Sequence, residues 1–158
     1  MQAKPTFYGS YMFRSRLEAR WAVFFDTIGF KWAYEPQSYR TMTGPYLPDF
    51  QVINGERNIF FEIKPKEPSA KETTLCMALA QLLSLGKFPI EVFLCYGSPG
   101  AEVIIMTRES FSSYWRDENI KFWADKYHEW YGGTLDGSTI LLAQTKASTY
   151  DFATFSDA

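Results

Sequence analysis

The fold is decided by residues 46–64, which read YLPDFQVINGERNIFFEIK. Two runs within this stretch, 46–53 and 58–64, are rich in aromatic and β-branched residues, which favour strands. The Asn54-Gly55 pair between them is the strongest short signal for a hairpin. We therefore predict two antiparallel strands joined at this turn.

The second strand of the hairpin carries charged residues on one face. Because successive side chains of a strand point to opposite faces, Glu62 and Lys64 share one face and Ile63 lies on the other. Pro48 has no N–H to donate to a ladder, so it belongs at a strand edge or bulge, where it re-aims Asp49. The hairpin thus predicts two carboxylates and one ammonium close together.

These three side chains suit a magnesium ion and a phosphate group. Mg²⁺ takes one or two carboxylates together with waters and substrate phosphate oxygens. A bound metal polarises a phosphoryl group and lowers the pKa of a water, while Lys64 would hold that water or offset charge on the phosphate oxygens. The alternative is a surface Glu62–Lys64 pair with Asp49 shaping only a turn. The joint presence of the hairpin, the Pro-Asp pair and the apolar flanks favours the metal site.

Pro48-Asp49, twelve intervening residues and Glu62-Ile63-Lys64 resemble the PD-(D/E)XK signature of restriction-endonuclease-like nucleases. Residues 13–22, FRSRLEARWA, and the following 34–36, YEP, resemble the first helix and strand of phage-associated members. They are also similar to the end-cleaving nuclease subunit of some transposons. The resemblance covers about residues 10 to 97.

The resemblance implies a mixed sheet flanked by helices and Mg²⁺-dependent DNA cleavage, with Mn²⁺ as a substitute. It implies metal ligation by Asp49, Glu62 and the main-chain carbonyl of Ile63. It also implies that Glu18, on the first helix, completes the acidic cluster and joins Asp49, Glu62 and Lys64 in the catalytic set. Ser15-x-x-Glu18 is at the same time a capping box, which needs no metal, so both interpretations of Glu18 stay open.

The charge distribution is uneven along the chain. The formal net charge is −2, whereas a DNA-binding domain is usually basic. Residues 1–66 carry nine Lys or Arg against six Asp or Glu, and residues 67–158 carry seven against twelve. The basic half contains the motif, and its candidate phosphate contacts are Arg14, Arg16, Arg20, Arg40 and Lys66, although each residue type is more often a solvated charge. The acidic half would discourage non-specific DNA binding or meet a basic protein partner.

The hydrophobic pattern predicts an α/β fold with an α+β mixed sheet. The expected helices span 15–28 and 69–86, and the expected strands span 31–39 with a break at Pro36, 46–53, 58–64, 90–96 and 103–106. Gly29 ends the first helix, and a Ser69–Glu72 capping box begins the second. Together with the resemblance, this order predicts a restriction-endonuclease-like αβββαβ core.

We expect one domain, 1–158, with a catalytic core at about 10–107 and an aromatic-rich C-terminal appendage at 108–158. Its aromatic and apolar residues at helical spacing are Ile120, Trp123, Tyr127, Trp130 and Tyr131, preceded by Phe111, Tyr114 and Trp115. They suit either a stacking platform for unpaired bases or packing against a core. Interspersed acidic residues would repel a phosphate backbone and favour packing.

Other features narrow the class of protein. Cys76, Cys95 and the one histidine, His128, lack zinc or disulfide spacing. Gln81, on the second helix, could face the site, but a polar position on a crossover helix is the favoured interpretation. Glu35 could orient a basic residue or a metal-bound water, and we assign it no catalytic role. The N-terminus lacks a leader pattern and no run approaches ~20 apolar residues, so we expect a soluble cytoplasmic protein of a cell or infected host, without membrane insertion.

The leading hypothesis is a Mg²⁺-dependent DNA endonuclease that uses in-line attack of a metal-activated water. The second is a nuclease subunit that acts only with a transposase, helicase or recombination protein. The third is a catalytically silent viral DNA-binding or structural protein, because fold alone does not imply function. The intact Asp49, Glu62 and Lys64 count against the third. The sequence leaves the monomer and the homodimer open.

Overall fold

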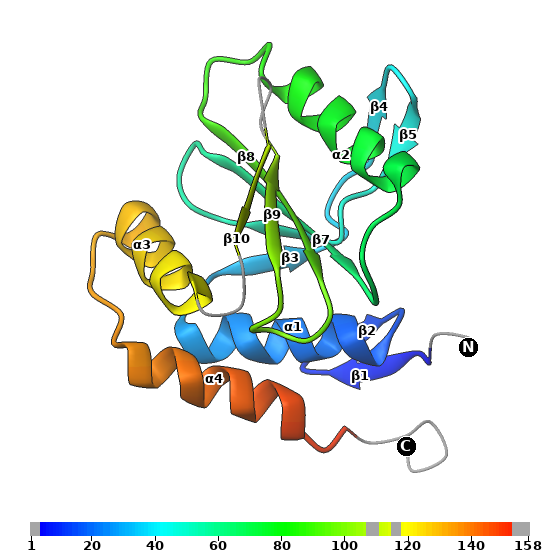
Figure 1. The fold of residues 1–158 in the computed structure, drawn as a ribbon. Coiled ribbons are helices and arrows are strands. Elements are labelled where there is room, and N and C mark those ends of the chain that lie inside the picture. Colours follow the sequence, from blue (N-terminus) through cyan, green and yellow to red (C-terminus); the bar gives the residue numbers. More distant parts are fainter. Residues whose placement is uncertain (1–3, 107–110, 115–117, 153–158) are drawn as a thin grey trace.

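The computed structural model describes residues 4–106, 111–114 and 118–152, and within them it shows a mixed α/β fold with four helices (Figure 1). In chain order the elements are β1 (Thr6–Tyr8), β2 (Tyr11–Phe13), α1 (Arg16–Ile28), β3 (Trp32–Tyr34), β4 (Tyr39–Thr41), β5 (Gly44–Tyr46), β6 (Phe50–Val52), β7 (Asn58–Lys64), α2 (Ala70–Leu83), β8 (Ile90–Tyr96), β9 (Val103–Met106), β10 (Phe111–Tyr114), α3 (Asn119–Tyr131) and α4 (Gly137–Thr149). The main sheet has six strands in the order β10-β9-β8-β7-β6-β3. Its β7–β8 pair is parallel and the other pairs are antiparallel.

The predicted hairpin is confirmed as β6 and β7, with Phe50 opposite Phe61. The expected strand 46–53 is not continuous, however. Tyr46 ends β5, which pairs with β4 in a separate two-stranded hairpin that we did not predict. Pro48 lies between β5 and β6, and its missing N–H is the physical reason for the break.

The two predicted helices α1 and α2 form where their caps place them. In α1, the Ser15 hydroxyl accepts a hydrogen bond from the Glu18 N–H, and Gly29 ends the helix in the left-handed conformation at φ 89°. In α2, Ser69 and Glu72 form a complete capping box. Helix α2 then provides the crossover between the parallel strands β7 and β8.

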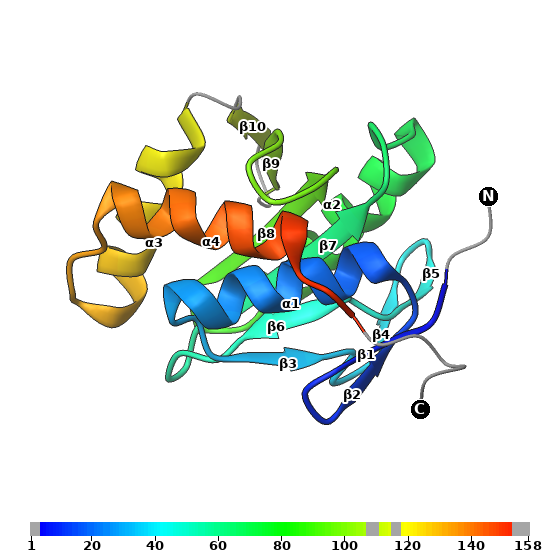
Figure 2. The same cartoon turned by 90° about the horizontal axis from the view of Figure 1, so that it is seen from below.

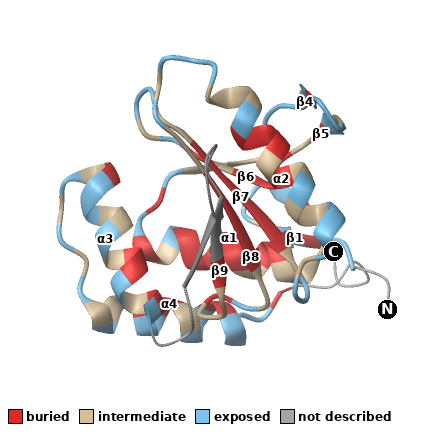
Figure 3. Ribbon diagram, turned by 45° about the horizontal axis from the view of Figure 1, so that its top comes forward, coloured by how far each residue is buried: buried red, intermediate tan, exposed pale blue. Residues whose placement is uncertain are grey.

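The alternating side chains of β7 divide the interior into two clusters. Ile59, Phe61 and Ile63 pack into the cluster that also holds buried side chains of α1, α3 and α4. Phe60 packs into a second cluster with α2. The sheet therefore lies between α2 on one face and the other three helices on the opposite face, with the buried residues concentrated on β7, β8 and α1 (Figure 3).

The residues expected as an appendage contribute to this interior. Trp123 of α3 is fully buried, with ring centroids 5.9 Å from Trp21 and 5.8 Å from Phe61. Trp130 is also buried and Tyr127 packs against the same cluster, which confirms the packing interpretation of α3. Helix α4, which the sequence did not predict, lies beside α1 (Figure 2).

The expectation for the other three aromatics falls outside what the structure describes. Phe111 and Tyr114 are described only as backbone of β10, and Trp115 lies outside the described residues. Within the described ranges, none of the helices has the length and apolar character required to cross a bilayer.

We expect Trp123→Ala to lower the free energy of unfolding by about 3–5 kcal/mol, because it leaves a cavity among packed rings. Urea denaturation followed by circular dichroism measures this loss. Leu142→Ala is the control, since Leu142 is exposed on α4 and its truncation should change stability by at most about 0.5 kcal/mol. Equal effects of the two substitutions would contradict the burial of Trp123 in the core.

Candidate active site

The structure brings together three carboxyl groups from three different elements. Glu18 lies in the first turn of α1, Asp49 directly precedes β6, and Glu62 lies on β7. Their exposed fractions are only 8%, 8% and 6%. The carboxyl of Asp49 is in hydrogen-bonding contact with those of both Glu18 and Glu62. Asp49 is therefore the centre of a buried acidic cluster.

Asp49 is held by the backbone of its two neighbouring strands. Its Oδ2 accepts a hydrogen bond of 2.7 Å from the N–H of Ile63, in the part of β7 that extends past the start of β6. Its main-chain carbonyl accepts a bond of 2.8 Å from the N–H of Glu35, which follows β3. The side chain of Asp49 thus takes the place that a longer β6 would have filled.

The main-chain carbonyl of Ile63 belongs to the same side of β7. The N–H and C=O of one strand residue point toward the same neighbouring strand. The Ile63 N–H points to Asp49, and the next carbonyl, that of Lys64, accepts from Gly97 beyond β8 at 2.9 Å. The Ile63 carbonyl accordingly faces the side of Asp49.

Burial and mutual repulsion govern the ionisation of the cluster. The pKa of Asp49 is raised well above its ordinary value by burial and then by the neighbouring Glu62. Burial, followed by the charge of Asp49, raises the pKa of Glu18 to about 7. Both shifts mean that the site favours a bound proton or another positive charge.

Lys64 lies at the edge of the cluster and is held by α2. Its Nζ forms a 3.1 Å ion pair with Oε2 of Glu72, and Oε1 of Glu72 accepts the Ser69 N–H at 2.9 Å. Burial lowers the pKa of Lys64, but the charges of Glu62, Glu72 and Asp49 outweigh it and raise this pKa above its ordinary value. Lys64 is therefore a cation fixed in place by Glu72, the glutamate of the α2 capping box.

Two tyrosines, which the sequence analysis did not assign to the site, bind the outer carboxyl groups. The Tyr34 hydroxyl donates to Oε1 of Glu18 at 3.0 Å, and the Tyr46 hydroxyl donates to Oε2 of Glu62. The Tyr46 oxygen also lies 3.2 Å from the sulfur of Cys76 on α2. The sequence signal for Tyr46 is its position three residues before Asp49. The signal for its partner Cys76 is the i, i+4 spacing from Glu72, which places both side chains on one face of α2.

Glu18 uses its carboxyl differently from the residue at the same position of α2. Its Oε1 accepts from the hydroxyls of Ser15, at 3.2 Å, and Tyr34. In α2, by contrast, Glu72 accepts from the N–H of the cap residue Ser69 and completes the box. Glu18 is thus oriented by hydroxyl groups toward Asp49 rather than by the cap amide.

The five basic residues predicted to contact phosphate lie in different surroundings. Arg14 is exposed and forms a 2.9 Å ion pair with Glu35, whose φ of 46° is strained for a residue other than glycine. Nη1 of Arg20 donates to the carbonyls of Ala147 and Ser148 at 2.8 Å each, so this side chain ties α4 to α1. Of the remaining three, Lys66 is exposed directly after β7, Arg16 is half-buried, and Arg40 is exposed on β4.

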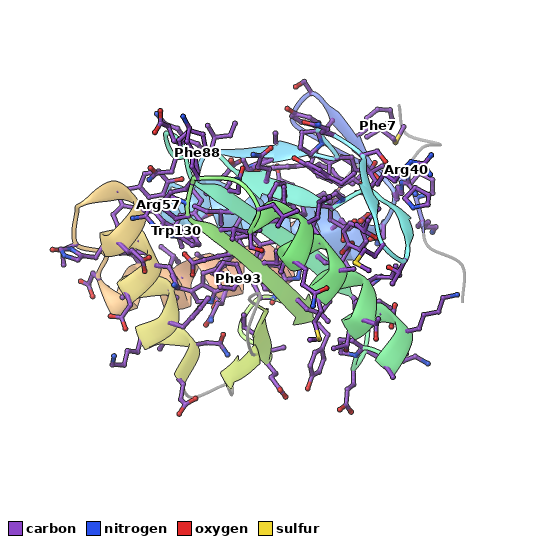
Figure 4. The ribbon with its side chains drawn as sticks, turned by 90° about the horizontal axis from the view of Figure 1, so that it is seen from above. Phe7, Arg40, Arg57, Phe88, Phe93 and Trp130 are labelled. Atoms are coloured by element: carbon purple, nitrogen blue, oxygen red, sulfur yellow. The ribbon has the colours of Figure 1, made fainter. Side chains whose placement is uncertain are left out.

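The other polar positions singled out in the sequence are exposed, unlike the buried carboxyl cluster. Arg40 is at the opposite end of the molecule from Arg57 and Trp130 (Figure 4). Gln81 is exposed on α2 and shares a pocket of about 410 Å³ with Arg40, Met42 and neighbouring apolar residues. His128 is exposed on α3, with Nδ1 at 3.1 Å from the Gly133 carbonyl oxygen.

The donor set fits a magnesium ion held by two carboxylates. Within the described ranges, no group of three or more His, Cys, Asp or Glu side chains is arranged to hold a metal ion. Magnesium needs only one or two carboxylates. Asp49 and Glu62 are buried against each other, and the ammonium of Lys64 on the neighbouring part of β7 forms an ion pair with Glu72. With the Ile63 carbonyl they form a suitable set, whereas metal ligation by Glu18 stays a prediction.

Comparison of the chain with protein-family models, curated proteins and solved structures finds no significant match. The chemistry must therefore be argued from the site itself.

The raised pKa of Glu18 predicts a pH-dependent stability. Between its ordinary value near 4.5 and about 7, the folded chain binds more proton at Glu18 than the unfolded chain does. The free energy of unfolding should therefore fall as pH rises through this window, and level off above it. Glu18→Gln should make the fall shallower, which urea titrations at pH 4.5 to 8 measure. If the free energy of unfolding of this variant fell with pH as steeply as that of the parent, Glu18 would not be the group with the raised pKa.

Proposed function

We propose that this protein is a Mg²⁺-dependent DNA endonuclease whose α1-β3-β6-β7-α2-β8 part is a restriction-endonuclease-like core with a PD-(D/E)XK site. One observation carries the proposal. The bond from the Ile63 N–H to Asp49 holds this carboxylate against Glu62 in a buried pair, with Lys64 two residues further along the same strand face as Glu62. A buried like-charged pair is costly unless a cation or a proton compensates it.

Each residue of the site has a separate task in this proposal. Asp49, Glu62 and the Ile63 carbonyl would hold the metal, which when bound lowers the pKa of a water and offsets phosphate charge. Lys64, fixed by Glu72, places an ammonium where negative charge develops on the phosphate oxygens. Glu18, with a pKa of about 7, exchanges protons near neutral pH next to Asp49.

The surroundings of the cluster support DNA as the substrate. Exposed Arg14 precedes α1, which carries Glu18, and exposed Lys66 follows β7, which carries Glu62. Both basic side chains therefore lie near the ends of the elements that form the site, where they would bind phosphates on either side of the cut bond. In this proposal the protein cuts DNA in the cytoplasm of a cell or of an infected host.

A nuclease that acts only with a protein partner is the second candidate. Helix α4 exposes Leu141 and Leu142, and residues 67–158 carry five more acidic than basic residues. An exposed apolar pair on α4, in a half of the sequence that is acidic overall, suits a basic partner protein. Cleavage that appears only after such a partner is added would favour this candidate over an independent endonuclease.

We expect Asp49→Asn and Glu62→Gln each to lower the cleavage rate on the order of 10²–10³-fold, since each removes one charge from the metal site. The measurement is a cleavage assay on labelled duplex, single-stranded, flap and branched DNA in Mg²⁺, Mn²⁺, Ca²⁺ or EDTA. It gives both the rate and the substrate preference. Glu56→Gln is the matched control, because Glu56 is exposed in the loop between β6 and β7. Cutting at the parent rate by either site variant would refute the proposed site.

Lys64→Ala should separate metal binding from cleavage. It removes an ammonium and no carboxylate, so the Mg²⁺ affinity measured by calorimetry should persist or rise while turnover falls on the order of 10²-fold. Folding is checked by the melting temperature, because the Glu72 ion pair is lost as well. Normal turnover in Lys64→Ala would exclude this lysine from the chemistry.

A further inference from the structure

The Tyr46 hydroxyl is enclosed between the sheet and α2. Tyr46 is the last residue of β5 and is buried, as are Glu62 and Cys76. Its hydroxyl donates to Oε2 of Glu62 and lies 3.2 Å from the sulfur of Cys76. A hydroxyl has one hydrogen and accepts through its lone pairs. Since that hydrogen is given to Glu62, the Cys76 thiol is the donor in the second contact.

This arrangement orders three groups in a line from the thiol of Cys76 through the hydroxyl of Tyr46 to the carboxylate of Glu62. Each side chain comes from a different element, namely α2, β5 and β7. A carboxylate that accepts a fixed hydroxyl cannot rotate freely about its last side-chain bond. One oxygen of Glu62, Oε2, therefore accepts the Tyr46 hydroxyl, and this bond fixes the orientation of the whole carboxyl group.

We propose that Tyr46 is a positioning residue, which holds the Glu62 carboxylate in the orientation that would bind a divalent cation, and that Cys76 in turn positions Tyr46. This inference rests on the proposed metal site. Residues that orient metal ligands through hydrogen bonds commonly affect metal affinity nearly as much as the ligands do. Tyr46 acts on the metal only through Glu62.

The chain connection between Tyr46 and Asp49 strengthens the assignment. The two residues are separated by Leu47 and by Pro48, whose ring fixes its φ and which is itself buried. One short segment thus provides Asp49 directly and orients the second carboxylate, Glu62, through the Tyr46 hydroxyl. The spacing between the two metal-binding carboxylates is set by this segment as well as by the strand pairing of β6 and β7.

Tyr46→Phe tests the inference because it removes the hydroxyl and retains the ring. We expect the Mg²⁺ affinity of the DNA-free protein, measured by titration calorimetry, to fall about tenfold. Turnover should fall at low Mg²⁺ and return toward the parent value when Mg²⁺ is raised by the same factor. The matched control is Tyr39→Phe, because Tyr39 is half-buried in the same cluster with its ring 5.6 Å from Phe60. This control should bind Mg²⁺ as the parent does.

Cys76 variants provide an independent measurement, also in case Tyr46→Phe does not fold. Cys76→Ala removes the donor to Tyr46 and should weaken Mg²⁺ binding about two- to fivefold, whereas Cys76→Ser retains a donor and should bind more tightly than Cys76→Ala. In a Tyr46→Phe background, Cys76→Ala should produce little further loss, because both substitutions interrupt the same line of hydrogen bonds.

The possible results separate this inference from the proposed function. Parent-like Mg²⁺ affinity in Tyr46→Phe, with binding lost in Asp49→Asn, would overturn only the role of Tyr46. A Tyr46→Phe protein whose turnover stays low at saturating Mg²⁺ would also overturn it, since the hydroxyl would then act on something other than metal binding. Parent-like Mg²⁺ affinity in Asp49→Asn would overturn the metal site itself.

Discussion

The site depends on one hydrogen bond, from the N–H of Ile63 to Oδ2 of Asp49. Pro48 prevents β6 from extending along β7, and without the Asp49 side chain the Ile63 N–H would be buried without this acceptor. A bond from a backbone amide to a carboxylate is stronger than one between neutral groups. It therefore compensates part of the cost of placing Asp49 beside Glu62, and it fixes the position of the carboxylate relative to the strand.

The rest of the fold supplies the rigidity that this acidic cluster needs. On one face of β7, Phe61 packs among the rings of Phe25, Phe93 and Trp123. On the other face, Phe60 packs against α2, which also provides Glu72 and Cys76. A functional cluster is positioned accurately only when packed elements fix the residues around it. Packing on both faces of β7 therefore offsets part of the cost of burying the carboxylates beside one another.

The parts of the structure that local chemistry determines were predictable from sequence. The caps of α1 and α2, the pairing of β6 with β7 and the buried strand β8 all follow from short patterns. The β4–β5 hairpin and α4 were missed, because their turn signals are weaker and their stability comes from contacts with distant residues. Arg20 illustrates the same limit. From the sequence we predicted a phosphate contact or a solvated charge at Arg20, and only the fold brings its side chain to the carbonyls of Ala147 and Ser148.

Two Ser-x-x-Glu motifs show how tertiary contacts select between the uses of one local pattern. At Ser69–Glu72 the capping box is complete, and the second oxygen of Glu72 reaches Lys64. At Ser15–Glu18 the serine caps the helix, but the carboxyl receives hydroxyl groups and contacts Asp49. The neighbouring Lys64 favours the capping role of Glu72, whereas contacts with Tyr34 and Asp49 hold the Glu18 carboxyl away from its cap amide. The same motif therefore holds Lys64 of β7 in place through α2, and through α1 it contributes an acidic side chain to the cluster.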